Sequence, residues 1–315
     1  MTGALASLAA RAYGGAWETR RRAYAAGLLR PHRVSARVVS VGNLAVGGTG
    51  KTTLALHLAQ RALALGWNVA VVCLEYQPGP SGRGDEALLF EAALGAGRVF
   101  SGRSKMEEAA RAASAGHDLI LVDDGFSHWR LERDLDLVLM DARDPWGGGA
   151  LLPAGRMREP RRALQRAGVV VVSRARDAAE AERLLSEIQP YAPAARLAAG
   201  RHRVVAVRGE QGTVAAAGAA RVVTATGNPQ AVAESAREAG FDPVTLSAYR
   251  DHHWFSEREA RREIEAARGA TLVLTAKDAV RWPAGNGGHV VLEVAWEWLL
   301  GGDEAERLAL SRESR

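Results

Sequence analysis

Short apolar runs alternate with amphipathic stretches from residue 37 onward, which predicts β-strands alternating with α-helices. Val69–Leu74 is an almost continuous apolar run, typical of a parallel strand buried on both faces. The predicted strands cover residues 37–41, 69–74, 98–100, 119–122, 135–140, 169–172, 221–225, 244–246 and 271–274. The predicted helices cover residues 52–65, 178–188, 230–239 and 257–267. Two more are predicted, one that begins at residue 85 and another that ends at residue 115. Repeated β-α units predict an α/β fold, a mostly parallel sheet with helices on both faces.

The first 33 residues have a different pattern, rich in Ala and Arg with scattered apolar and aromatic positions. We expect one or two amphipathic helices here, interrupted near Gly14-Gly15. The basic cluster Arg20-Arg21-Arg22, with Trp17 and Tyr24 nearby, suits an anionic membrane interface. The alternative is a helix that packs on the main domain and leaves its arginines in solvent. We therefore predict a basic N-terminal helical segment over 1–33, a main lobe over 34–175 and a smaller C-terminal α/β lobe over 176–315.

The most specific motif follows the first predicted strand, where a glycine-rich turn leads directly into a helix. Glycines let backbone N–H groups converge on phosphate oxygens, and the helix N-terminus adds favourable partial charge. Lys51 would reach the β- and γ-phosphates and the Thr52 hydroxyl would bind Mg²⁺, although Ala45 stands where the strict P-loop spacing has Gly. The predicted nucleotide-binding residues are Gly47, Gly48, Thr49, Gly50, Lys51, Thr52 and Thr53.

Two carboxylates follow the apolar strand at residues 119–122, in the sequence Asp123-Asp124-Gly125. Open parallel sheets bind ligands at the carboxyl ends of their strands. Asp123 or Asp124 would therefore hold Mg²⁺, directly or through water. The alternative is an ordinary Asp-Gly turn at the end of a strand.

The composition, 47% hydrophobic and 24% charged, is that of a soluble globular protein, and a single Cys excludes a disulfide framework. The net charge of +5 favours an anionic partner such as a nucleotide, a nucleic acid or a membrane surface. Of 41 basic residues only Lys51, Lys105 and Lys277 are lysines. Arg cannot replace Lys where a compact ammonium must fit a tight site. For Lys105, however, a GC-rich coding bias is the favoured interpretation, because charged residues usually lie on the surface.

Taken together, these motifs resemble those of the tetraacyldisaccharide 4'-kinases, the lipid A 4'-kinases. The resemblance continues through residues 123–131 (Asp-Asp-Gly-Phe-Ser-His-Trp-Arg-Leu), 152–160, Asp251-His252 and 275–278 (Thr-Ala-Lys-Asp). It implies a P-loop kinase that transfers the ATP γ-phosphate to the 4'-hydroxyl of a tetraacylated glucosamine disaccharide 1-phosphate in lipid A biosynthesis. It also implies Mg²⁺ as cofactor and a peripheral position on the cytoplasmic face of the inner membrane. No nucleic-acid partner is expected.

The resemblance also implies roles for individual residues. Asp85, in Gly84-Asp85-Glu86, matches the catalytic base, His252 matches the histidine that supports it, and Lys51 completes the catalytic set. The motifs further suggest a set of substrate-contacting residues: Tyr76, His128, Arg158, Glu159 and Lys277. Without the resemblance, Asp85 would be read as a helix N-cap and His252 as a surface histidine.

The chain departs from the family pattern after its second predicted strand. The family usually has Ser-Arg-Gly-Tyr-Gly there, whereas Cys73–Gly79 places Glu75 at a typically basic position. Ser127 replaces the usual Gln after Asp-Asp-Gly-Phe. These changes leave the phosphate motifs intact and alter the region expected to contact the acceptor. Two alternatives therefore stay open: a P-loop ATPase switch that binds a protein partner, and a kinase of the same fold with another acceptor.

Overall fold

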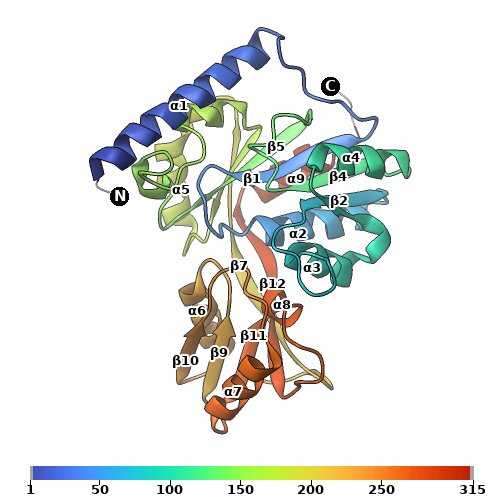
Figure 1. The fold of residues 1–315 in the computed structure, drawn as a ribbon, viewed down its shortest axis with the longest axis vertical. Helices are drawn as coiled ribbons and strands as arrows, with labels where there is room; N and C mark the ends of the chain where they lie inside the picture. Colours follow the sequence, from blue (N-terminus) through green and yellow to red (C-terminus); the bar gives the residue numbers. More distant parts are fainter. Residues whose placement is uncertain (1–2, 313–315) are drawn as a thin grey trace. The chain divides into compact units, whose positions relative to one another are not determined.

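The computed structural model describes residues 3–312, which form two compact units (Figure 1). Unit 1 contains the residues up to Leu74, Leu94–Arg201 and those from Trp296 onward. Unit 2 contains Glu75–Ala93 and His202–Ala295. The units therefore differ from the predicted lobes, which met at residue 175. The physical reason is that the long strands β7 (Arg196–Gly209) and β12 (His289–Leu300) each begin in one unit and end in the other, so no loop marks the boundary.

The sheet of unit 1 positions the two predicted phosphate motifs. Its strands lie in the order β3-β2-β4-β1-β5-β6-β7, and each pair in this order is parallel. Val41 of β1 is in register with Asp123 of β4, so the glycine-rich turn and the acidic pair leave the sheet at the same edge. The strands besides β7 are β1 (Arg37–Asn43), β2 (Val69–Leu74), β3 (Val99–Gly102), β4 (Leu119–Asp123), β5 (Leu135–Asp141) and β6 (Val169–Ser173).

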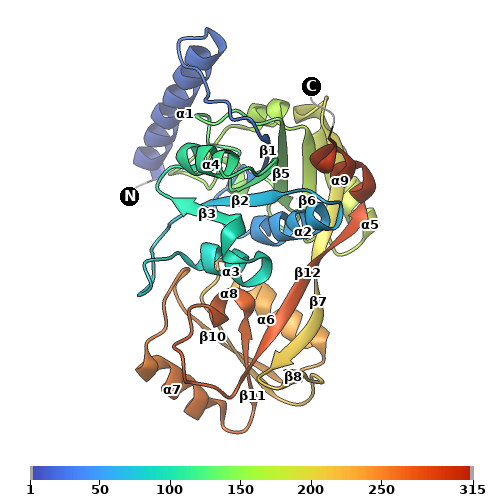
Figure 2. The same ribbon diagram turned by 90° about the vertical axis from the view of Figure 1, so that its right-hand side faces the viewer.

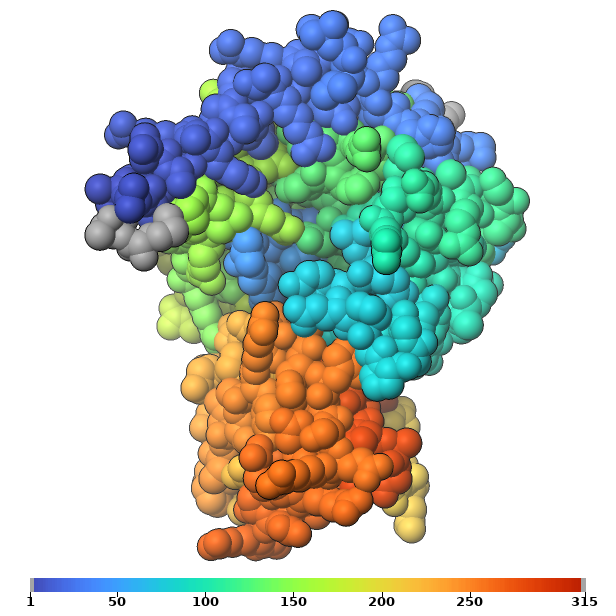
Figure 3. Space-filling model, in the orientation of Figure 1, coloured from blue at the N-terminus to red at the C-terminus, as the bar shows by residue number. Residues whose placement is uncertain are grey.

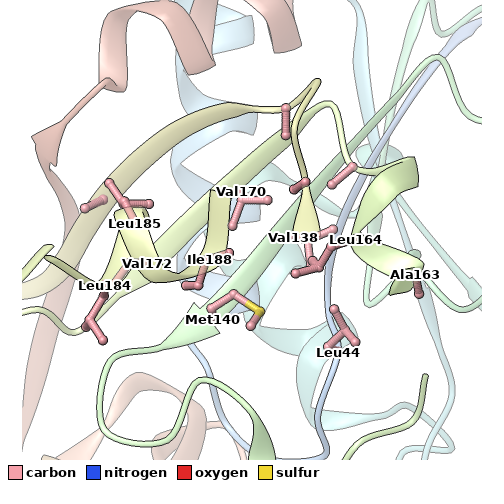
Figure 4. Close-up of a cluster of buried hydrophobic side chains, with 14 of the residues drawn as sticks. Leu44, Val138, Met140, Ala163, Leu164, Val170, Val172, Leu184, Leu185 and Ile188 are labelled. Carbon is pink, nitrogen blue, oxygen red and sulfur yellow. The ribbon is translucent and has the colours of Figure 1, made fainter. Parts of the chain in front are cut away.

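Helices cover both faces of this sheet. Helices α2 (Lys51–Ala64) and α4 (Lys105–Ser114) lie on opposite sides of β2 (Figure 2). Helix α5 (Ala178–Ile188) packs Leu184, Leu185 and Ile188 with valines of β5 and β6 in one buried cluster (Figure 4). Helix α9 (Gly302–Leu310) lies beside α2, with Glu306 Oε1 2.6 Å from His57 Nε2. The predicted fold class is confirmed.

The N-terminal segment forms one continuous helix, α1 (Gly3–Ala25), on the outside of unit 1 (Figure 3). The predicted break near Gly14-Gly15 is wrong. A Cβ at Gly14 would lie 3.1 Å from Leu151 Cδ1, so glycine lets the helix lie close to its support. Trp17 is buried edge-on against Trp129, which offsets the helix cost of glycine, about 1 kcal/mol per residue. No helix among residues 3–312 is both long and apolar enough to cross a bilayer.

The strands of unit 2 lie in the order β10-β9-β11-β12, and each pair in this order is parallel. Besides β12 they are β9 (Ala220–Thr224), β10 (Val244–Ala248) and β11 (Thr271–Thr275). Alternate residues of β9 face two cores: Val222 packs with α6 (Pro229–Ala239) and Val223 with α7 (Glu257–Ala267). The remaining elements of this unit are α3 (Asp85–Leu94), α8 (Ala276–Ala279) and β8 (Gly212–Thr213). Short 3₁₀ turns in unit 1 cover Ala96–Arg98, Gly147–Gly149, Arg161–Arg166 and Gln189–Tyr191.

Candidate functional site

The glycine-rich turn of unit 1 has the backbone conformation that its sequence requires. Gly47 and Gly50 have φ of +132° and +91°, in the region that favours glycine, and α2 begins at Lys51. The Asn43 side chain donates to Thr49 Oγ1 at 3.2 Å and steadies the turn. Ala45, at the position where the strict motif has Gly, forms a β-bridge with Met157 and does not have positive φ. The absence of Gly there therefore leaves the turn intact.

The acidic pair after β4 meets this turn, and its two carboxylates have different partners. Thr52 Oγ1 donates to Asp123 Oδ2 at 3.1 Å. Asp124 instead accepts from both Nη atoms of Arg158, at 2.6 and 2.7 Å, and its Oδ1 is 3.7 Å from Lys51 Nζ. Burial would raise the pKa of Asp124, but Lys51 and Arg158 hold it well below its usual range. Asp124 is thus ionised and bound to cations, whereas Asp123 faces the Thr52 hydroxyl.

Lys105 is the clearest residue that the sequence interpretation missed. Its side chain is buried, with the residue only 3% exposed, and its Nζ donates to the backbone carbonyl of Asp124 at 2.6 Å. The surface position expected for Lys105 is therefore wrong. As the first residue of α4, Lys105 reads in the sequence as an exposed residue at the start of a surface helix. Only the fold places this end of α4 beside β4.

Two arginines close to the glycines were also missed. A Cβ at Gly47 would lie 3.7 Å from Arg156 Nη1, and one at Gly48 would lie 3.9 Å from Arg174 Nη2. Both arginines also form ion pairs with nearby carboxylates, Arg156 with Asp144 and Arg174 with Asp141. Arg156 stands in the 152–160 segment that carries the resemblance, whereas in a chain so rich in arginine no local signal separates Arg174 from the solvated arginines.

Glu159 and His128, two predicted substrate residues, have mostly internal contacts. Glu159 is 2% exposed and accepts from the indole N–H of Trp17 at 2.9 Å and that of Trp129 at 3.2 Å. Arg166 completes its contacts at 2.8 Å. Glu159 therefore fastens α1 to unit 1. Burial, reinforced by Lys105, lowers the pKa of His128 from 6.5 to about 4.

In unit 2, Asp85 begins α3 and lies at the centre of a buried charge cluster. It is 2% exposed, and its carboxylate oxygens are 2.9 and 3.1 Å from Nδ1 of His252. Lys277 Nζ and Arg281 Nη1 lie 3.5 and 3.3 Å from Oδ2. His252 has φ of +61°, and its backbone N–H donates to the Ala225 carbonyl at 3.1 Å, which fixes this unusual conformation. The structure thus brings together three of the predicted site residues, Asp85, His252 and Lys277, and adds Arg281.

The electrostatics of this cluster keep Asp85 ionised. Burial would raise the pKa of Asp85, but the hydrogen bond from His252 and the charges of Lys277 and Arg281 lower it below its usual value. Burial in turn lowers the pKa of Lys277, but Glu86, at 3.3 Å, and Asp85 raise it above its usual value. A buried, ionised carboxylate beside an imidazole can accept a proton from a hydroxyl group.

The altered segment after β2 lies next to this cluster. The half-exposed Tyr76 ring is edge-on to His252, with centroids 5.1 Å apart. Glu75 accepts from the backbone N–H of Gly84, immediately before Asp85, and its Oε1 is 3.6 Å from Arg83 Nε. Glu75, which stands at the typically basic position, therefore holds together the two ends of the loop between residues 75 and 84.

Comparisons with known proteins agree with these motifs. A family model described as tetraacyldisaccharide-1-P 4'-kinase matches residues 3–309. A tetraacyldisaccharide 4'-kinase of Anaeromyxobacter sp. (strain Fw109-5) is 39% identical over 287 residues, covering 82% of this chain and 76% of that protein. A protein of the same name from Geobacter sulfurreducens is 33% identical over 328 residues, covering 90% and 85%. A crystal structure of LpxK from Aquifex aeolicus in complex with ATP matches with a TM-score of 0.72 at 20% identity, covering 98% of both chains. The predicted resemblance is confirmed.

Proposed function

Because this chain belongs to the tetraacyldisaccharide-1-P 4'-kinase family, we propose that it transfers the γ-phosphate of ATP to the 4'-hydroxyl of a tetraacylated glucosamine disaccharide 1-phosphate. The observation that carries this proposal is the pairing of buried, ionised Asp85 with His252 in a chain that also has a formed phosphate-binding turn. A nucleotide switch needs the turn alone, whereas a hydroxyl-directed kinase also needs a group that receives the proton.

Unit 1 supplies the nucleotide-binding groups in this proposal. The backbone N–H groups of residues 47–53 bind the phosphates, and Lys51 neutralises charge on the transferred phosphoryl group. The oxygen donors of Thr52 and Asp123 suit Mg²⁺, which takes one or two protein ligands and keeps waters and phosphate oxygens. Residues 3–312 contain no group of three or more His, Cys, Asp or Glu that could hold a metal. When bound, Mg²⁺ neutralises negative charge on the β- and γ-phosphates.

Unit 2 supplies the proton acceptor. Asp85 takes the proton of the acceptor hydroxyl onto a carboxylate oxygen, and His252 orients that carboxylate through Nδ1. Lys277 offers a positive charge and Tyr76 a half-exposed ring beside the pair, which suits contacts with a phosphorylated sugar. The internal contacts of Glu159 favour a role in holding α1 rather than one in binding substrate.

We further propose that α1 contacts the cytoplasmic face of the inner membrane, as a peripheral element. Leu5 and Leu8 are 58% and 65% exposed, and the helix carries the Arg20–Arg22 cluster, while Trp17 anchors its other side to unit 1. An amphipathic helix with apolar and basic exposed residues suits an anionic lipid interface.

The transfer of ³²P from ATP to the disaccharide 1-phosphate in mixed micelles tests the proposed activity. The wild-type chain is expected to label the acceptor, and Asp85→Asn to bind ATP normally but transfer phosphate about 10²–10⁴-fold more slowly, as for the loss of a general base. Glu187→Gln, at an exposed ion pair on α5, is the matched control and should keep full activity. If a folded, ATP-binding preparation leaves the disaccharide 1-phosphate unlabelled, the proposal that this lipid is the phosphate acceptor is refuted. ATP turnover stimulated by a protein instead of the lipid would favour the switch.

A further inference from the structure

Arg281 is the fully buried cation of the Asp85 cluster, and each part of its guanidinium group has a partner. Nη2 is 2.6 Å from Asp278 Oδ1, and Nη1 is 3.3 Å from Asp85 Oδ2. Nη1 also donates to the Ala225 carbonyl at 2.9 Å, and Nε to the Lys277 carbonyl at 3.0 Å. The guanidinium is planar and rigid, so these contacts fix its position and direction. One guanidinium therefore lies between two carboxylates that belong to different segments.

The second carboxylate, Asp278, is held independently of Asp85. It is fully buried and accepts from the Ala225 N–H at 2.8 Å and from Thr275 Oγ1 at 2.6 Å. A buried charge is costly unless it is paired, so Arg281 and Asp278 stabilise each other. The positive charge of Arg281 is thereby divided between a fixed structural carboxylate and Asp85.

We propose that Arg281 is a positioning residue that orients the Asp85 carboxylate and keeps it ionised, and that Asp278 limits how strongly it does so. This inference rests on the proposed role of Asp85 as proton acceptor. Too weak a positive field would leave Asp85 protonated and unable to accept a proton. Too strong a field would make its carboxylate a poor base, because proton affinity falls as the ionised form is stabilised.

The other charged groups facing Asp85 come from three segments. His252 contacts it at 2.9 Å, and Asp251 lies 3.9 Å from the far nitrogen of that imidazole. Lys277, at 3.5 Å, is shared with Glu86, at 3.3 Å. His252 and Lys277 contact Asp85 directly and not through the side chains of Arg281 or Asp278, so the two substitutions should act on Asp85 in opposite directions.

The test is the titration of the Asp85 carboxyl in the full-length protein, followed by ¹³C NMR with labelled aspartate and assigned with Asp85→Asn. Arg281→Met is expected to raise the titration midpoint by about one pH unit or more, the usual effect of removing a close opposite charge. Asp278→Asn is expected to lower the midpoint, because Arg281 then acts on Asp85 alone. The acid limb of the pH profile for kcat/KM should move in the same two directions.

Arg221→Met is the matched control, because it removes another ion pair of unit 2, with Nη2 2.7 Å from the buried Glu263. It should lower stability and leave the Asp85 midpoint unchanged. Arg281→Lys keeps the positive charge but loses the planar pair of guanidinium donors. It should therefore move the Asp85 midpoint less than Arg281→Met does, while lowering kcat more than it changes KM. It also decides the matter if Arg281→Met fails to fold.

An unchanged midpoint in folded Arg281→Met, a wild-type kcat in Arg281→Lys, or shifts in the same direction for Arg281→Met and Asp278→Asn would overturn the proposal. Failure of the proposed function gives a different result. In that case the midpoints shift as expected while Asp85→Asn keeps full transfer activity, which separates the field on Asp85 from its use in catalysis.

Discussion

Each of the three lysines lies beside an oxygen acceptor in the described structure. Lys51 Nζ is 3.7 Å from Asp124 Oδ1, Lys105 Nζ is 2.6 Å from the Asp124 carbonyl, and Lys277 Nζ is 3.3 Å from Glu86 Oε1. All of the remaining residues among the 41 Lys and Arg are arginines. An ammonium group is a compact point charge with three rotatable donors, whereas a guanidinium needs a wider planar space. The rare lysines thus mark the two places where cations are packed closely.

His128 predicts a pH dependence of stability at the scale of a single residue. Its pKa is lowered from 6.5 to about 4 in the folded chain, so between these values the unfolded chain binds a proton that the folded chain does not. The free energy of unfolding should therefore fall as pH falls through this window, by about 1 kcal/mol at pH 5 after allowance for partial exposure. Urea denaturation at pH 7 and pH 5 measures it. His128→Gln should lose this part of the dependence, and the exposed His32→Gln should keep it; equal slopes for both variants would contradict the assignment.

At the scale of elements, the end of β1 and the turn after β4 can approach each other only because residue 42 is glycine. A Cβ at Gly42 would lie 2.4 Å from Phe126 Cβ and 2.7 Å from the Phe126 backbone nitrogen. Phe126 is fully buried and follows Asp123-Asp124-Gly125, so it cannot move away without moving the acidic pair. The close approach therefore fixes Asp123 and Asp124 relative to the phosphate-binding turn that β1 leads into.

Gly42→Ala is expected to lower the free energy of unfolding by about 1–3 kcal/mol, the usual range for overpacking a core. Phosphate transfer should fall further than the loss of folded protein explains, because the acidic pair shifts. Chemical denaturation and activity at saturating ATP measure the two effects. Gly97→Ala, where an added Cβ meets open space, is the control. If the Gly42→Ala protein is as stable as this control, the turn after β4 can move to accommodate the added Cβ without a loss of stability.

The elements predicted from the sequence are those with a local signal. Strands such as Val69–Leu74 are continuously apolar because both faces are covered, and the structure agrees with their predicted bounds to within a few residues. Strands β7 and β12 were missed because their burial alternates irregularly along 14 and 12 residues, with charged residues among the apolar ones. Helix α9 was missed as well.

The candidate site was predictable to the same extent. Two motifs have a spacing that indicates phosphate and metal binding, and they contain Lys51, Thr52, Asp123 and Asp124. The resemblance supplied Asp85 and His252. Arg281 follows a short helix in a stretch that reads as surface, and its partners Asp85 and Ala225 lie far away in the sequence. Only the folded chain brings them together.

At the scale of the whole molecule, the net charge of +5 and the exposed leucines of α1 predict binding to anionic vesicles. The double substitution Leu5→Ser and Leu8→Ser should weaken this binding about tenfold or more, because it removes apolar area that would enter the interface. Raising the salt concentration should weaken it too, through screening of the basic residues. Vesicle sedimentation measures both effects.

Substitution separates lipid contact from folding better than deletion of residues 1–30, which would also remove Trp17 from Glu159. Leu65→Ser, an exposed leucine just after α2, is the matched control and should bind vesicles like the wild type. If the double variant also sediments like the wild type, α1 has no part in membrane binding.

The interleaving of the two units has a consequence for protein synthesis. The chain passes from one unit to the other four times. Helix α9, near the end of the described chain, belongs entirely to unit 1. Trp67 Nε1 donates to the Leu310 carbonyl at 3.2 Å, so the region around α2 is completed by residues that the ribosome adds after all of residues 202–295. The phosphate-binding turn is translated early, yet its own unit closes last. Order of translation and order of completion are therefore reversed: the unit begun first waits, with part of its surface uncovered, until the unit begun second has left the ribosome.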